Sequence, residues 1–321
     1  MGLLEKIHEQ QNKIIFISIS LLAIQTFYLI FSLGVNFPIS DEIDYIPLVK
    51  TFFDGGPWWN DSHFLQQHEH RLITFGIILL ISSILDNWNI VNQMYFASSF
   101  LIIASISLYY LLRRTDVKLI WLAIPIALIL FNAGQSDYFL WGICGISWFT
   151  ASASIFLAIF FISKIENSRF AIVFAIVFSV IASFTIIHGL LFWIVGGFGL
   201  LFLQNKKKNS LIIWSLSALA VYLIYFTNYT RGTFKGIQYD TLFTVEGIEY
   251  ILLFLSNGLI VHLREFYPIQ ITISIIIIMI IIGGPIYLKI KKRLDNKMIP
   301  WVQIGMFGLL GAVITELGRL G

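Results

Sequence analysis

Long apolar runs alternate with short polar connections along nearly the whole chain. Runs of about twenty residues, such as 14–35, 91–112 and 268–288, contain no charged residue. A helix of that length crosses the hydrocarbon core of a bilayer, and only helices or closed barrels satisfy their backbone groups in lipid. The runs lack the alternation of apolar and polar residues that barrel strands require. The pattern therefore predicts an all-α, polytopic transmembrane helical bundle.

The positions of Lys and Arg decide which apolar segments cross. If all eleven segments cross with the N-terminus inside, the basic clusters near 113–118, 164–169 and 206–208 fall outside, against the positive-inside bias. Segment 72–85 is only fourteen residues long, and segment 246–261 is interrupted by a Ser-Asn-Gly sequence. If these two segments lie in the interface or re-enter the membrane, every basic cluster moves inside.

We therefore expect a multi-pass protein of the cell membrane with a cytoplasmic N-terminus, formed as one membrane-embedded domain over residues 1–321. It has about nine crossing helices plus two interfacial or re-entrant apolar helices. The expected crossings are 14–35, 91–112, 119–133, 142–163, 170–187, 189–204, 210–227, 268–288 and 299–317. This topology places the polar loop 36–71, the turn around Asp137, His188 and the stretch 228–267 on one external face.

Composition agrees with this interpretation. The chain is 58% hydrophobic and 12% charged, and its mean hydropathy is +0.84. A net charge of +3 does not indicate a nucleic-acid partner, so the lipid bilayer is the expected environment. The lone Cys144 excludes an internal disulfide and a multi-cysteine metal site. The first apolar run has no small-residue cleavage site after it, which predicts a retained helix.

Three acids follow the first apolar run closely. Asp41 and Glu42 are adjacent, and Asp44 comes two residues later. Adjacent carboxylates help to hold one another's protons, so one of them can act as a general base or bind a metal while the other orients it. Alternatively, Ser40 or Asp41 caps a short interfacial helix over 45–53, whose positive end favours acids. Both interpretations can hold together.

A denser polar sequence precedes the segment 72–85. It contains His68, Glu69, His70 and Arg71. Arg offers a planar fork for phosphate and His a tunable proton donor, while His70 and Glu69 can ligate a divalent cation. Two histidines two residues apart on a helix point about 200° apart, so joint chelation requires an extended backbone. The alternative is a polar cap on the apolar segment that follows.

Two further places on the expected external face carry candidate groups. Asp137 and Tyr138 precede Trp141 and Trp148, which can stack on a sugar ring or belong to an interfacial aromatic belt. His188 lies beside a glycine between two short apolar segments. Its side chain lines a cavity on the external face, or it is a structural residue whose hydrogen bonds are satisfied.

Two arginines late in the chain are candidate phosphate ligands. Arg264 lies in the external stretch, where contact with lipid headgroups explains it equally well. Arg319 follows Glu316 by three residues, one neighbour step on a helix, so the two can pair at the membrane edge. A buried arginine in such a position favours a phosphate site.

The order of these features resembles the GT-C superfamily of integral-membrane glycosyltransferases, which use polyprenyl-phosphate-linked sugars. The chain is similar to a prokaryotic group within it that carries an E-H-R loop motif, matched here in Gln67–Arg71. Further similarity lies in 135–148, 182–193 and 316–321. His68 stands where the group usually has Asn, and Cys144 where it usually has Gln. The group continues into further helices, so the resemblance predicts a chain shortened at its C-terminus.

The resemblance implies an inverting sugar transfer on the extracytoplasmic face. The donor is a polyprenyl-phosphate sugar, and the acceptor is a hydroxyl of a glycan, lipid or protein. Asp41 or Glu42 is the catalytic base, and a divalent cation held by His70 and Glu69 is an open expectation. The implied substrate-binding residues are Asp44, His68, Glu69, His70, Arg71, Asp137, His188, Arg264 and Arg319.

Two other classes of function stay open. A lipid or solute transporter, including a flippase, needs ionisable residues within its crossing helices, and those helices are almost empty of charge here. A non-catalytic accessory membrane subunit would bind the lipid-linked sugar without turnover. The gathering of ionisable groups on one face favours the enzyme.

Overall fold

The structure is a computed structural model, and its described part is mostly helical. The described residues are 3–166, 168, 170–203, 208–230, 239–257, 259, 266–291 and 294–319, with the side chains of 3–9, 63, 239, 240, 318 and 319 left out. Within these ranges no β-strand forms, and the one antiparallel bridge joins Gln67 to His70. The all-α prediction is confirmed.

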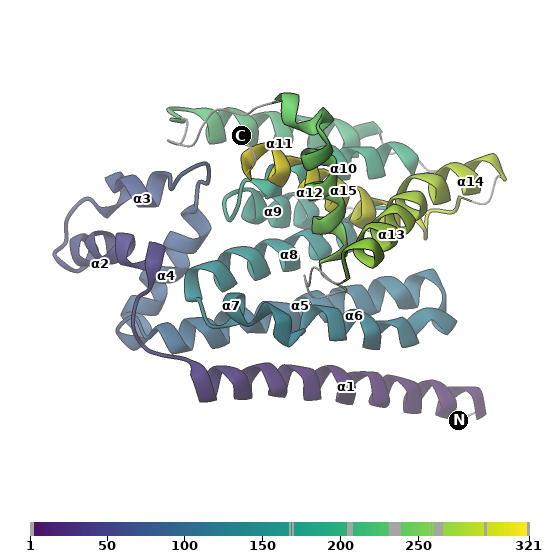
Figure 1. Cartoon of the computed structure of the whole chain (residues 1–321), viewed down its shortest axis with the longest axis horizontal. Helices are drawn as coiled ribbons and strands as arrows, with labels where there is room; N and C mark the ends of the chain where they lie inside the picture. The colour runs from purple at the N-terminus through teal and green to yellow at the C-terminus, as the bar shows by residue number, and fades with distance from the viewer. Residues whose placement is uncertain are drawn as a thin grey trace. The chain divides into compact units, whose positions relative to one another are not determined.

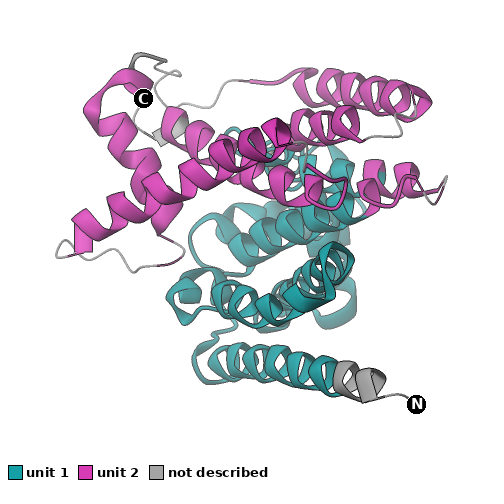
Figure 2. Cartoon of the chain, turned by 90° about the vertical axis from the view of Figure 1, so that its right-hand side faces the viewer, with its two compact units in different colours: residues 1–160, 177–189 teal, residues 161–176, 190–321 magenta. Residues whose placement is uncertain are grey.

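The chain forms two compact units, and each is described by itself. Unit 1 comprises residues 1–160 and 177–189, and unit 2 comprises residues 161–176 and 190–321 (Figure 2). The single membrane-embedded domain expected from the sequence stays a prediction.

Unit 1 begins with a long helix that packs along two others. The helices from its first segment are α1 (Leu3–Leu33), η1 (Ser40–Tyr45), α2 (Ile46–Phe53), η2 (Trp58–Asn60), α3 (Ser62–Leu65), α4 (Ile73–Asp86), α5 (Ile90–Thr115), η3 (Val117–Leu122), α6 (Ala123–Leu130), η4 (Ala133–Gln135), α7 (Ser136–Phe139) and α8 (Gly142–Ile162). Helix α1 lies beside α5 and α6 (Figure 1). The Tyr109 hydroxyl donates to Asn12 Oδ1 at 2.7 Å and joins α5 to α1. After α1 ends, Asn36 Oδ1 accepts the N–H of Ile90 at 2.9 Å, which fixes the start of the polar loop to the start of α5.

The remaining helices lie partly or wholly in unit 2. They are α9 (Ala171–Ser183), α10 (His188–Phe202), α11 (Lys208–Phe226), η5 (Tyr239–Phe243), α12 (Val245–Ser256), α13 (Tyr267–Ile278), the π-helical segment η7 (Met279–Gly283), α14 (Gly284–Ile290) and α15 (Ile299–Arg319). Helix α12 packs against α13 and α15. The indole N–H of buried Trp214 donates to the carbonyl of Trp193 at 2.9 Å and ties α11 to α10.

Seven helical stretches of the described residues are long and apolar enough to cross a membrane, as expected of a multi-pass membrane protein. They span Gln10–Leu33, Ile90–Thr115, Val117–Phe139, Gly142–Ile162, Lys208–Phe226, Tyr267–Ile290 and Ile299–Leu317. Each coincides with a predicted crossing. The third span is composite, because η3, α6, η4 and α7 follow one another within it.

The other two predicted crossings, 170–187 and 189–204, form shorter helices than the sequence suggests. Helix α9 has 13 residues and α10 has 15. At 1.5 Å per residue these are about 20 and 22 Å long, below the roughly 30 Å of a hydrocarbon core. The count of nine crossings therefore stays a prediction. The two segments expected not to cross form α4, with 14 residues, and α12, with 12.

Candidate functional site

Glu42 is the buried member of the acidic pair. It is 2% exposed, although it belongs to the short helix η1 in a polar loop. Its Oε2 accepts the N–H of Ile39 at 3.0 Å, and its Oε1 accepts the N–H of Ile143, 101 residues away, also at 3.0 Å. The carboxylate thus caps the first turn of α8, where N–H groups have no partner within the helix.

Burial and hydrogen bonding act on Glu42 in opposite directions. Burial raises the pKa of its carboxyl above the ordinary 4.5, and backbone N–H groups of Ile39, Ile143 and Gly142 act to lower it. The carboxylate of Asp41 adds a smaller rise to the pKa. A Cβ at position 142 would lie 2.9 Å from Glu42 Oε1, so a side chain there would force the carboxylate to shift. Glu42 therefore joins the polar loop to α8.

The other two acids of this loop face more open surroundings. Asp41 is half-buried and Asp44 is exposed. The Ser40 hydroxyl donates to Asp41 Oδ1 at 3.2 Å. Ser40 has a φ of +50°, in the left-handed region that L residues seldom adopt, so the backbone is strained just before the acids. Asp41 is therefore the more accessible member of the pair.

Tyr45 joins the acidic part of the loop to the histidine part. It is fully buried, and its hydroxyl donates to Gln67 Oε1 at 2.9 Å. Its ring meets Phe75 of α4 edge-on, with centroids 4.9 Å apart. Burial raises the pKa of the phenol above its ordinary value of 10, and the nearby carboxylates of Asp41, Asp44 and Asp61 raise it further. The hydroxyl is therefore held protonated as a donor.

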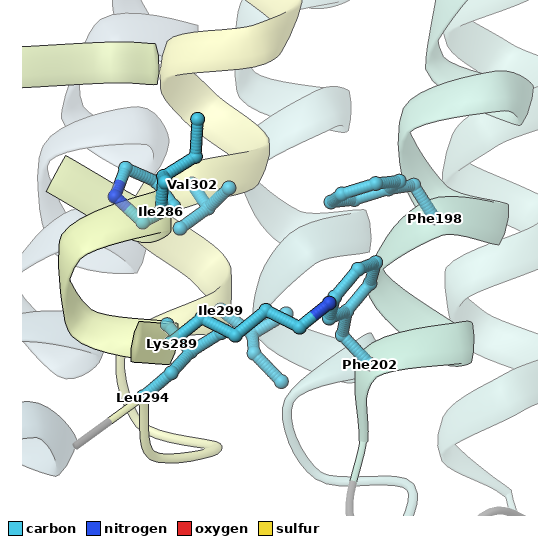
Figure 3. A pocket seen from close by; sticks show the side chains of 8 residues that line it. Phe198, Phe202, Ile286, Lys289, Leu294, Ile299 and Val302 are labelled. Carbon is cyan, nitrogen blue, oxygen red and sulfur yellow. The ribbon is translucent and has the colours of Figure 1, made fainter. Parts of the chain in front are cut away.

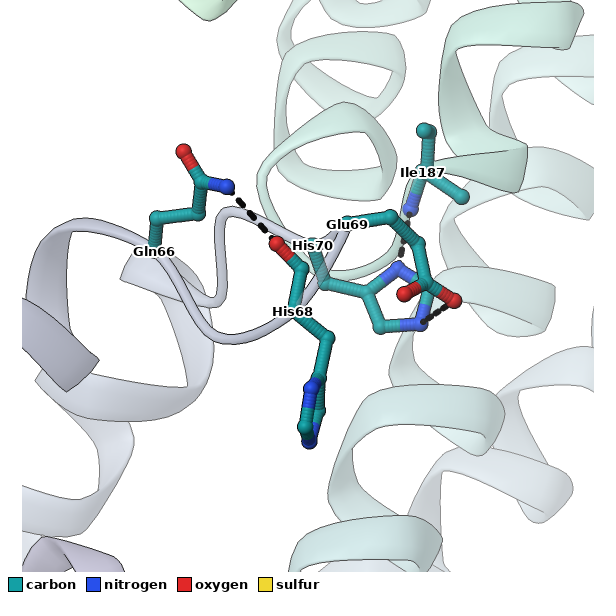
Figure 4. A network of polar contacts seen from close by, with 5 residues as sticks. All are labelled: Gln66, His68, Glu69, His70 and Ile187. Carbon is teal, nitrogen blue, oxygen red and sulfur yellow. Dashed lines mark hydrogen bonds and ion pairs between the residues drawn. The ribbon is translucent and has the colours of Figure 1, made fainter. Parts of the chain in front are cut away.

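The residues from Gln67 to His70 form a tight turn (Figure 4). The sequence had left two alternatives open, an extended chelating loop and a polar cap on the helix that follows. Gln67 and His70 exchange two backbone hydrogen bonds, each 2.8 Å long. His68 has a φ of +52° and is exposed at the tip of the turn, and its carbonyl accepts from Gln66 Nε2 at 2.7 Å. The two histidines therefore stand at different positions of one turn.

His70 connects this turn to the segment between α9 and α10. Its Nδ1 accepts the N–H of Ile187 at 3.3 Å, across 117 residues (Figure 4). An accepting Nδ1 carries a lone pair, so the ring proton of neutral His70 lies on Nε2. That nitrogen is 3.4 Å from Glu69 Oε1. In its neutral form, His70 is thus oriented with its N–H toward a carboxylate.

The start of α4 reinforces this connection. The Thr74 N–H donates to the carbonyl of Phe184 at 2.9 Å, and its hydroxyl to that of Ile181 at 3.3 Å. Just before α4, Arg71 is 8% exposed and its Nη1 lies 3.4 Å from the carbonyl of Leu65. The guanidinium is therefore held inside the loop, and Arg71 directly follows His70 in the sequence.

His188 lies in the same region of unit 1. It is 9% exposed at the start of α10, and its ring centroid lies 5.3 Å from that of Trp148. Trp148 in turn contacts Tyr138, with centroids 6.3 Å apart. Burial lowers the pKa of His188 to about 4, with His70 lowering it further and Glu69 raising it. Asp137, next to Tyr138, is exposed in α7.

Unit 1 thus brings together most of the residues that the sequence proposed. The loop bearing Asp41, Glu42 and Asp44 contacts the start of α8, and the turn bearing His68, Glu69 and His70 contacts the segment before His188. Arg264 lies outside the described residues, and so does the side chain of Arg319. Their predicted roles rest on the sequence alone.

The described donors fit a metal ion poorly. A divalent cation takes at least four ligands. His70 Nε2 and Glu69 Oε1 supply two, and His70 Nδ1 is engaged by Ile187. The described residues contain no group of three or more His, Cys, Asp or Glu side chains that could hold an ion.

The roles of three contributors were not anticipated from the sequence. Tyr45 and Gln67 make the buried hydrogen bond across the loop, and the backbone N–H of Ile187 orients His70. A tyrosine inside an acidic stretch is a usable signal, because a buried phenol needs an acceptor. A backbone donor leaves no signal in the sequence.

Known proteins give no guidance on this arrangement. No family model matches the chain, no curated protein matches it, and no solved structure resembles it closely enough to indicate a relationship.

Proposed function

We propose that the chain is a membrane glycosyltransferase of the GT-C type, with about nine crossings and its site on the extracytoplasmic face. It transfers a sugar from a polyprenyl-phosphate donor to an acceptor hydroxyl with inversion at the anomeric carbon. The observation that carries the proposal is the joining of separate polar segments in unit 1. Glu42 bonds to Ile143, His70 bonds to Ile187, and the ring of Trp148 lies tilted against that of His188.

Asp41 is the base in this proposal. Glu42 already accepts two backbone N–H groups, so it positions the loop, while Asp41 remains half-buried at the surface. A carboxylate of Asp41 takes the proton of the acceptor hydroxyl as that oxygen forms a bond to the anomeric carbon. The bond from the anomeric carbon to the phosphate oxygen breaks, and its electron pair leaves with the polyprenyl phosphate.

The leaving phosphate needs positive or donor groups in a region shielded from water. Arg71 is the buried cation of the loop, and a guanidinium matches phosphate in shape and charge. The rings of Trp148 and Tyr138 offer flat apolar surfaces of the kind that pack on sugars. The bilayer takes the isoprenoid tail.

A transfer assay tests this function. Purified protein is given a panel of radiolabelled polyprenyl-phosphate sugars with a membrane extract as the source of acceptors. Asp41→Asn should slow transfer by about 10²–10⁴-fold, because general base catalysis contributes that much. Asp54→Asn is the matched control, since Asp54 is an exposed acid at the end of α2.

The outcomes separate the parts of the proposal. Wild-type transfer that persists in Asp41→Asn would assign the base to another residue. A folded wild type that transfers no sugar from any donor in the panel would reject the enzyme.

One observation favours the rival class of transporters. Glu316 is fully buried in the span Ile299–Leu317, and carriers place ionisable residues in their crossing helices. It is a single carboxylate near one end of its span, whereas the ionisable groups of unit 1 form a cluster. We therefore favour the enzyme, and a donor that moves between leaflets without transfer would reverse that choice.

A further inference from the structure

An apolar pocket opens in unit 2 between three helices (Figure 3). Phe198 and Phe202 of α10 form one wall, and Ile286 of α14 forms another. Ile299 and Val302 of α15 complete it, with Ile299 only 4% exposed. The cavity measures about 170 Å³. Small-molecule sites commonly measure about 300–1,000 Å³, so this pocket holds only part of a larger ligand.

One cation stands at the edge of this pocket. Lys289 lines it and is exposed, and its Nζ lies over the ring of Phe202, 5.2 Å from the centroid. A lysine held over an aromatic face keeps its charge at the pocket rather than extending into water. In the described part of the chain Lys289 forms no ion pair with an acid. The pocket therefore combines apolar walls with one positive charge available to an anion.

The pocket lies where two apolar spans end. Lys289 is the last but one residue of the span Tyr267–Ile290, and Ile299 is the first of the span Ile299–Leu317. The intervening connection of residues 291–298 is too short to cross a bilayer, so both spans end on the same side. Lipid phosphates lie at that depth, with the first part of the acyl chains just below them.

We propose that this pocket binds an anionic glycerophospholipid, with its phosphate on Lys289 and part of one acyl chain between Phe198, Phe202 and Val302. The charge of the surrounding sequence agrees with this occupant, because residues 289–297 contain five Lys or Arg and one Asp. Basic segments beside a membrane span attract anionic lipids. The apolar walls require an occupant with a hydrocarbon part, which inorganic phosphate lacks.

Lys291 provides a matched control on the same helix end. It is also an exposed lysine near an aromatic ring, with its Nζ 6.0 Å from the centroid of Tyr287. It does not line the pocket. Lys289→Gln and Lys291→Gln therefore remove the same charge from the same surface, and only the first removes it from the pocket.

Native mass spectrometry of the delipidated full chain tests the proposal. Phosphatidylglycerol and phosphatidylcholine with identical chains are added separately, and the affinity of the first bound lipid is measured. The wild type should prefer phosphatidylglycerol. Lys289→Gln should weaken that binding by about fivefold, the effect of one lysine on an anionic lipid, and Lys291→Gln by less than twofold. Lys289→Arg should retain it, and Val302→Phe should weaken both lipids by filling the pocket.

Three results would overturn the proposal. Equal losses in Lys289→Gln and Lys291→Gln would mean attraction to the general charge of the surface. Equal wild-type affinity for the two lipids would remove the anionic headgroup from the site. Displacement of phosphatidylglycerol by excess inorganic phosphate would identify a free anion as the ligand. Melting temperatures close to the wild type in every variant show that binding, and not folding, has changed.

Discussion

The two units bury ionisable side chains in different ways. In unit 1, Glu42 is 2% exposed and both of its oxygens accept backbone N–H groups. In unit 2, Glu316 is 0% exposed, and no described group donates a hydrogen bond to either oxygen. Its Oε1 lies beside Gly247 near the start of α12, where a Cβ would come within 2.8 Å. Burial alone therefore does not show whether a carboxylate stabilises the fold. The hydrogen-bond donors around its oxygens decide this.

His188 gives the largest expected effect within unit 1. Its pKa lies near 4 in the folded chain, below the ordinary 6.5, so the folded state favours the neutral ring. Between pH 6.5 and 4 the unfolded state binds more protons, and stability falls as the pH falls. The full loss is about 3 kcal/mol, at 1.36 kcal/mol per pKa unit. Thermal unfolding in detergent across this range measures it.

His188→Gln is the comparison for this titration, since glutamine does not ionise. The variant should lose much of the decline in melting temperature between pH 6.5 and 4. Other ionisable groups remain in the variant, so a smaller residual slope is expected. An unchanged slope would mean that another group carries the pH dependence.

Glu42→Gln comes next and tests the role of the backbone donors. Glutamine replaces one accepting oxygen by an NH₂ group, which leaves either Ile39 or Ile143 without its acceptor. We expect a loss of about 2 kcal/mol, in the range for a buried hydrogen bond to a charged group. The free energy of unfolding measures the change. Asp44→Asn, at an exposed acid two residues on, should stay within about 0.5 kcal/mol of the wild type.

Glu316→Gln should have the smallest effect and the opposite sign. The same change removes a buried carboxyl group for which the described residues offer no donor, so we expect a gain of about 1 kcal/mol. The measurement is the same unfolding experiment at neutral pH. If Glu316→Gln destabilises the chain as much as Glu42→Gln does, the contrast between the two units is wrong.

The helices follow from the sequence more completely than the contacts of the candidate site do. Runs such as 91–112 and 299–317 appear as helices with nearly the expected bounds, because hydropathy and length alone define a membrane helix. The run 170–187 was overestimated, since Ile186 and Ile187 continue its apolar character beyond the end of α9 at Ser183. Hydropathy does not register where a backbone stops being helical.

The sequence grouped the candidate residues on one face but did not predict which of them contact one another. The charge distribution grouped the polar loop and His188 on one face, and the structure joins the loop to Ile187 and Ile143 within unit 1. The sequence could not tell which of Asp41 and Glu42 turns inward. That choice depends on backbone N–H groups a hundred residues away, and every residue except proline carries one.

The π-helical segment Met279–Gly283 has a consequence for the phase of its helix. A π turn accommodates about one more residue than an α turn, so residues after it are rotated by about 100° from their place on an unbroken α-helix. Lys289 and Ile286 owe their direction to this offset as well as to their position in the chain. The isoleucine-rich run looks uniform in sequence, but the residues before and after the π turn therefore point in directions that one continuous α-helix would not give them.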